Sequence, residues 1–175
     1  MKSKNLDAIQ VLAKIGKILS NIVQVCCIVG CCICLVGLIG MAVGVDIVKI
    51  GGAGLQDMAN VSIGSVYATM AVGFIMCAGE AVLAGFATGY FKRELVVGTP
   101  FSYDGAKELM RLGILTICIP LGTQIVAAIT HAIIKVTMGN VGSMDLGNGA
   151  SVALGVTFII VSVIFRYGAE IQEKN

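Results

Sequence analysis

Four long apolar stretches run along the chain, and shorter polar segments separate them. They cover about residues 21–45, 64–90, 112–136 and 150–166. A helix needs about 20 apolar residues, within a range of about 17–25, to cross a bilayer. Strands with open edges are excluded because lipid cannot satisfy their backbone hydrogen-bonding groups. The pattern therefore predicts an all-α integral membrane protein, with a four-helix bundle that forms a single domain over residues 1–175.

The composition agrees with a membrane protein. Hydrophobic residues make up 57% of the chain and charged residues 13%, whereas soluble domains average about 45–50% and about 25%. The first stretch is longer than the apolar core of a signal peptide, about 7–15 residues, so we expect it to be retained as a span. The net charge of +2 is too small to indicate direct binding of nucleic acid.

The basic residues are concentrated in alternate polar segments. Ten of the twelve Lys and Arg residues lie before the first stretch, between the second and third, or after the fourth. Cytoplasmic segments of membrane proteins carry an excess of Lys and Arg. The distribution therefore predicts that both termini and the loop 91–111 are cytoplasmic.

The N-terminal segment, residues 1–20, is predicted to be an amphipathic helix. Apolar side chains recur at helical spacing and polar side chains form the opposite stripe. The apolar stripe is Leu6, Ile9, Leu12, Ile15, Leu19 and Ile22, and the polar stripe is Asp7, Gln10, Lys14, Lys17 and Asn21. Such a helix either lies on the membrane surface, docks on a partner, or simply leads into the first span.

The loop 91–111 is predicted to contain a helix start. Pro100 disfavours helical geometry at the residue before it. Ser102 is a residue type that caps helix N-termini, and Asp104 would lie in the first turn, where the helix dipole favours negative charge. We therefore expect an amphipathic cytoplasmic loop helix that continues into the third span.

The segment "GTPFSYDGAKELMRLGIL" resembles the hallmark of domain of unknown function family 2975. The matching positions are Gly98, Pro100, Phe101, Ser102, Arg111 and Gly113. The resemblance implies a small four-span protein of the bacterial cytoplasmic (inner) membrane, with no established enzymatic activity. Such proteins are often encoded beside small helix-turn-helix regulators, which implies a cytoplasmic protein partner or shared regulation.

Two polar residues, Glu80 and Gln124, lie within the predicted spans. Glu80 is twelve residues from Lys92, a rise of roughly 18 Å. Gln124 is thirteen residues from Arg111, a rise of roughly 20 Å. The two side chains are therefore a candidate intramembrane polar pair. They would serve either as a hydrogen bond between helices or as a proton- or cation-coupled transport site.

Five of the seven cysteines lie in "CCIVGCCIC", residues 26–34. Free Cys behaves as a small hydrophobe, so we interpret the cluster as part of the first span. A metal or redox site and acylation are the alternatives. Gly-x-x-x-Gly pairs such as Gly85 and Gly89 favour close helix packing, within the chain or in a homo-oligomer.

No catalytic or phosphate-binding motif is found in the sequence, and neither a cofactor nor a metal site is expected. The sequence therefore predicts a non-enzymatic membrane protein that acts through a cytoplasmic partner, as an anchor, sensor or regulatory subunit. The alternative is a small proton- or cation-coupled transporter or channel that uses Glu80.

Overall fold

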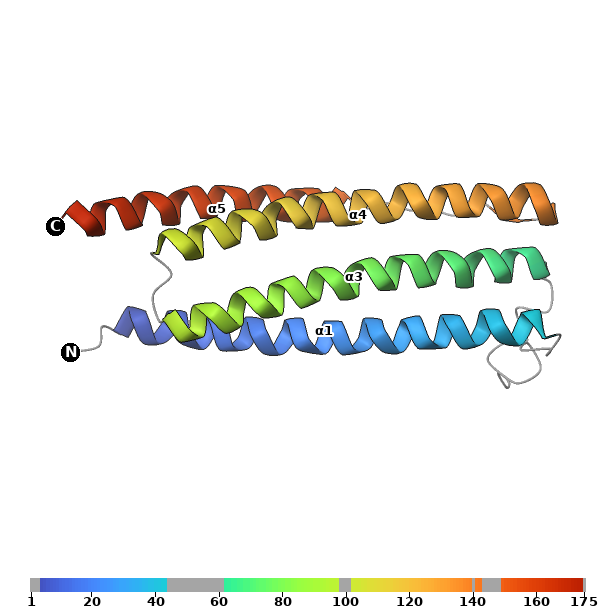
Figure 1. Ribbon diagram of the computed structural model, residues 1–175, viewed down its shortest axis with the longest axis horizontal. Helices are drawn as coiled ribbons and strands as arrows, with labels where there is room; N and C mark the ends of the chain where they lie inside the picture. Colours follow the sequence, from blue (N-terminus) through green and yellow to red (C-terminus); the bar gives the residue numbers. More distant parts are fainter. Residues whose placement is uncertain (1–3, 44–61, 98–101, 140, 143–148, 175) are drawn as a thin grey trace. The chain divides into compact units, whose positions relative to one another are not determined.

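The computed structural model describes residues 4–43, 62–97, 102–139, 141–142 and 149–174. These residues form the helices α1 (Lys4–Ala42), α3 (Ile63–Val97), α4 (Tyr103–Met138) and α5 (Gly149–Lys174) (Figure 1). All four are long and apolar enough to cross a membrane. The predicted all-helical fold is confirmed for these residues, which supply four candidate membrane spans.

The helices are longer than the apolar stretches that predicted them. α3 continues to Val97 and α4 begins at Tyr103, so most of the predicted loop 91–111 is helical and belongs to these two helices. α4 continues through Pro120. α1 runs from Lys4 to Ala42 without interruption, so the N-terminal segment leads directly into the first span. A separate amphipathic helix is not confirmed.

The chain falls into two compact units. Unit 1 contains Met1–Cys26, Glu80–Leu121 and Asn148–Asn175, and unit 2 contains Cys27–Gly79 and Gly122–Gly147. The four-helix bundle stays a prediction. The sequence ranges of unit 1 include ten of the twelve basic residues. Which side of the membrane they face also stays a prediction.

In unit 1, α1 packs on α3 through small and polar side chains. A Cβ atom on Gly16 would lie 2.7 Å from the ring of Phe91. The hydroxyl of Ser20 donates to the carbonyl oxygen of Ala84 at 2.7 Å and accepts from the hydroxyl of Thr88 at 3.0 Å. In lipid no hydrophobic driving force brings helices together, so close packing and hydrogen bonds of this kind hold them in contact.

The described members of the apolar stripe predicted for the N-terminal segment, which lie between residues 12 and 22, face away from this contact. Leu12 is 70% exposed and Leu19 58% exposed, whereas Ala13 is only 6% exposed. Ile15 and Ile22 are also exposed. Within the membrane these apolar side chains are suited to contact with lipid.

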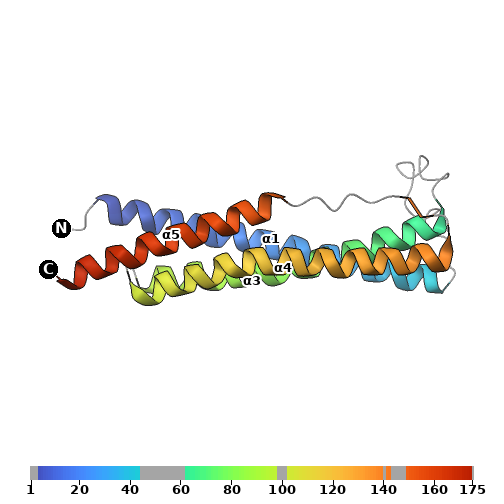
Figure 2. The ribbon, with the colours of Figure 1, turned by 90° about the horizontal axis from the view of Figure 1, so that it is seen from above.

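In unit 1, α4 also packs closely on α5. A Cβ atom on Gly155 would overlap Cγ1 of Ile117 and lie 2.9 Å from the carbonyl oxygen of Gly113. The buried hydroxyl of Ser162 donates to the carbonyl oxygen of Ala106 at 2.7 Å. Figures 1 and 2 show α5 beside the N-terminal half of α4. The two backbones approach closely because both positions are glycines.

Unit 2 is held by similar contacts. A Cβ atom on Gly30 would lie 3.1 Å from Sγ of Cys77, and one on Gly37 would lie 3.3 Å from Sδ of Met70. The backbone N–H of Gly142 donates to the hydroxyl of Ser65 at 3.1 Å. Glycines and small polar groups therefore also make the contacts between helices here.

The α4–α5 contact predicts that Gly155→Ala destabilises the protein. The new methyl group would meet backbone as well as side-chain atoms, and overpacking of this kind costs typically about 1–3 kcal/mol. Gly89→Ala is the matched control, because nothing lies within 4 Å of a Cβ atom at Gly89. Thermal unfolding in detergent should show a lower midpoint for Gly155→Ala only. Equal midpoints for the two variants would contradict the close approach.

Candidate functional site

A crevice of about 1060 Å³ lies between the C-terminal part of α3 and the N-terminal part of α4, entirely within unit 1. It combines charged side chains of both signs with exposed apolar side chains. The charged lining residues are Lys92, Arg93, Glu94, Asp104, Lys107, Glu108 and Arg111. Because polar and apolar groups share one cavity, the crevice can receive a ligand that is itself amphiphilic.

The α4 side of the crevice begins at a capped helix end. The backbone N–H of Gly105 donates to the hydroxyl of Ser102 at 3.0 Å, and that of Ala106 donates to the carbonyl oxygen of Ser102 at 3.0 Å. Asp104 lies in the first turn, where its charge complements the helix dipole. The predicted helix start at Ser102 is confirmed.

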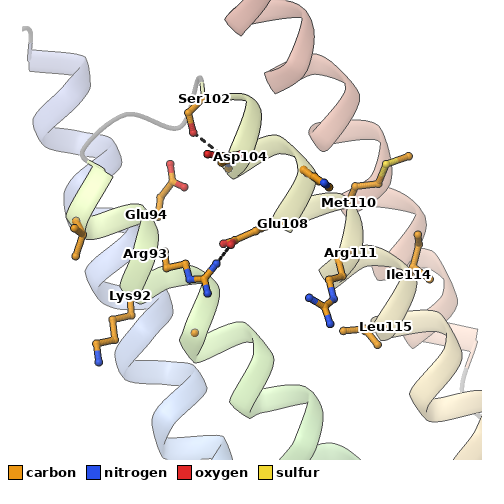
Figure 3. Close-up of a pocket in the computed structure, with 14 residues that line it drawn as sticks. Lys92, Arg93, Glu94, Ser102, Asp104, Glu108, Met110, Arg111, Ile114 and Leu115 are labelled. Carbon is orange, nitrogen blue, oxygen red and sulfur yellow. Dashed lines mark hydrogen bonds and ion pairs between the residues drawn. The ribbon is translucent and has the colours of Figure 1, made fainter.

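An ion pair connects the two sides of the crevice. Nη1 of Arg93 on α3 donates to Oε1 of Glu108 on α4 (Figure 3). The Arg93 side chain is 73% exposed and that of Glu108 30% exposed. Exposed ion pairs typically contribute about 0–1 kcal/mol, so this pair orients the two helix ends more than it stabilises them.

Arg111 lies over an aromatic ring. Its guanidinium is 6.0 Å from the centroid of the Phe86 ring, within the range of a cation–π contact. Figure 3 shows the guanidinium directed from α4 into the gap toward α3. In the described part of the chain no carboxylate forms an ion pair with it. Its hydrogen-bond donors can therefore bind an anion.

Glu94 is the residue that sequence reasoning missed. Its side chain lines the crevice from α3, yet the residue is only 9% exposed, and Oε1 is buried without a hydrogen-bond partner among the described residues. The sequence placed it in a loop that began at residue 91. One signal could have found it: in a helix that continued past residue 90, Glu94 shares a face with Phe91, which packs on Gly16 of α1.

The structure describes only part of the predicted motif. Ser102 caps α4, Arg111 lies over Phe86, and Gly113 allows the close approach of α5. Gly98, Pro100 and Phe101 lie outside the described residues. The described part of the motif therefore builds the α4 wall of the crevice and its packing on α5.

The candidate polar pair is divided between the two units. Glu80 is half-buried on α3 in unit 1, and Gln124 is half-buried on α4 in unit 2. Nε2 of Gln124 is buried and has no hydrogen-bond partner in the described part of the chain. Their pairing stays a prediction.

Three of the cysteines pack at the contact between α1 and α3 in unit 2. Cys31, Cys34 and Cys77 carry free thiols. Sγ of Cys31 lies 3.9 Å from the carbonyl oxygen of Phe74. Across residues 4–43, 62–97, 102–139 and 149–174, no three His, Cys, Asp or Glu side chains are grouped so that they could hold a metal ion.

The four apolar helices define the chain as a multi-pass membrane protein. No family model, curated protein or solved structure matches it.

The cap at Ser102 predicts that Ser102→Ala weakens the start of α4. Loss of an N-cap side chain typically costs about 1 kcal/mol. Hydrogen exchange should become faster at the amides of residues 105–107, and Ser102→Asp should restore the wild-type rates because Asp also caps well. Unchanged exchange in Ser102→Ala would show that the hydroxyl does not hold this helix end.

Proposed function

We propose that this chain is a non-enzymatic membrane protein that acts through a cytoplasmic protein partner, as an anchor, sensor or regulatory subunit. The observation that supports the proposal is the group of exposed basic side chains at one end of α3 and α4. Lys92, Arg93, Lys107 and Arg111 are all exposed, and they line a single crevice. A partner with an acidic surface fits this charge.

The proposal places this end of unit 1 in the cytoplasm. The excess of Lys and Arg in the polar segments supports that orientation. The loop resembles domain of unknown function family 2975. This resemblance supports a location in the bacterial inner membrane, and it supports a helix-turn-helix regulator as the candidate partner. Both termini would then be cytoplasmic as well.

A photo-crosslinking amino acid at Lys107 tests the proposal. We expect a protein adduct in native membranes when the probe replaces Lys107. The matched control replaces Val136, which is 87% exposed near the other end of α4, and should give no such adduct. The same adducts at both positions would contradict a partner at the crevice.

The captured protein must then bind the purified chain. The double variant Lys92→Glu and Lys107→Glu should weaken binding at least about tenfold, because like charges across an interface are repulsive. The loss should be smaller at high salt, because salt screens exposed charges. Unchanged binding by the double variant would exclude an acidic partner at this surface.

A small transporter or channel is the second candidate function, and it rests on Glu80. This carboxyl group is half-buried on a membrane-spanning helix, and intramembrane ionisable residues commonly mark ion pathways. The buried, unpartnered amide nitrogen of Gln124 is a further polar group within a span. Each of these two polar groups supports a transport function by itself, whether or not the two side chains are paired.

Proton flux into liposomes separates the two functions. If the chain transports protons, Glu80→Gln should lower the flux at least about tenfold, because the amide cannot carry the proton. Glu170→Gln is the matched control, since Glu170 pairs with Arg166 on the same helix and should leave the flux unchanged. Wild-type flux no greater than that of empty liposomes would exclude this candidate.

A further inference from the structure

Of the charged lining groups that lack an ionic partner in the described part of the chain, two of opposite charge lie on different sides of the crevice. One is the guanidinium of Arg111, and the other is the carboxylate of Glu94. Figure 3 shows them on opposite sides of the Arg93–Glu108 pair, with Asp104 on the side of Glu94. The crevice therefore has an anion-binding side and a cation-binding side.

The buried carboxylate requires a hydrogen-bond donor. A buried acceptor without a partner costs about 1–3 kcal/mol, and more when it is charged. The nearest basic residue in sequence, Arg93, is paired with Glu108 instead. Because the Glu94 side chain lines a cavity of about 1060 Å³, a rotation of this side chain would bring the buried oxygen to a ligand that supplies the donor.

The position of Arg111 along α4 indicates where this ligand comes from. No Asp, Glu, Lys or Arg lies between Arg111 and Lys135, a rise of roughly 36 Å. The hydrocarbon core of a bilayer is about 30 Å thick, so Arg111 lies at its boundary, where lipid headgroups lie. Val96, Met110 and Ile114 are exposed and line the same crevice, which suits acyl chains.

We propose that the crevice binds a phosphoethanolamine group, with the phosphate on Arg111 and the primary ammonium on Glu94 and Asp104. Arginine pairs well with phosphate because its N–H groups match two oxygens at once. The ammonium brings three N–H donors, as a lysine side chain does. The adjacent apolar lining assigns the group to a phospholipid of the phosphatidylethanolamine type. This site does not depend on the protein partner proposed above.

Lipid binding to the purified full-length chain, measured by native mass spectrometry, tests the proposal without any mutation. Three lipids with identical acyl chains are compared: phosphatidylethanolamine, phosphatidylcholine and phosphatidylglycerol. Phosphatidylcholine has no N–H donor, and phosphatidylglycerol has no cationic group. We expect phosphatidylethanolamine to bind at least about tenfold more tightly than either, because a hydrogen bond to a charged group is at stake. Equal binding of the three lipids, or preference for phosphatidylglycerol, would overturn the proposal.

Variants assign the two ends of the ligand. Glu94→Gln should lower the affinity for phosphatidylethanolamine more than that for phosphatidylcholine, because only the primary ammonium donates hydrogen bonds. Arg111→Met should weaken both, because both lipids carry the phosphate. Glu170→Gln is the control and should bind as the wild type does. If Glu94→Gln retained the preference for phosphatidylethanolamine, the assignment of the ammonium site would be wrong.

Soluble glycerophosphoethanolamine distinguishes a lipid from a free ligand. If the ligand is a lipid, the soluble compound should compete only at concentrations at least about a hundredfold higher, because it lacks the acyl chains that contribute about 0.8 kcal/mol per buried CH₂. Competition at equal concentration would overturn the assignment to a lipid.

Discussion

Close approach of helix backbones is the constraint on which the rest of unit 1 depends. In lipid no hydrophobic effect draws helices together, so they associate where small side chains let the backbones meet. Gly16 and Ser20 do this between α1 and α3, and Gly113 and Gly155 between α4 and α5. Between the adjoining ends of α3 and α4 the described contacts are instead an ion pair and a cation–π contact. The crevice lies between these helix ends, where the described contacts are made by long side chains.

The prediction from sequence succeeded for features whose physical signal does not depend on whether water or lipid surrounds the helix. The four spans follow from length and apolarity alone, and the start of α4 follows from the chemistry of Ser102. For the N-terminal segment the sequence left open what the apolar stripe contacts. In water an apolar stripe marks the buried side of a helix. In lipid the same stripe can face the acyl chains, because they are as apolar as Leu. Leu12 and Leu19 are exposed, while Ala13 of the same segment is buried.

Glu94 was missed for a different reason. The apolar stretch that predicted α3 ends at residue 90, and the charged residues after it were interpreted as a loop. Helices can extend beyond the hydrocarbon core, since each further residue adds one backbone hydrogen bond. α3 therefore reaches Val97, and Glu94 lies on the wall of the crevice. Composition alone does not reveal that this segment is helical. Phe101 and its neighbours, by contrast, fall outside the described residues, so the role of that half of the motif stays a prediction.

The energies across the crevice connect the two proposals. The Arg93–Glu108 pair contributes about 0–1 kcal/mol, and an exposed cation–π contact such as that of Arg111 about 0.5–1 kcal/mol. If a ligand bound one arrangement of the helix ends about 3 kcal/mol more tightly than another, this difference would exceed the energy of either contact. The equilibrium between the two arrangements shifts by that difference in binding free energy. Lys92 and Lys107 belong to the same helix ends. A headgroup bound between α3 and α4 would therefore change the surface that a protein partner meets, which is the arrangement that a membrane-bound sensor requires.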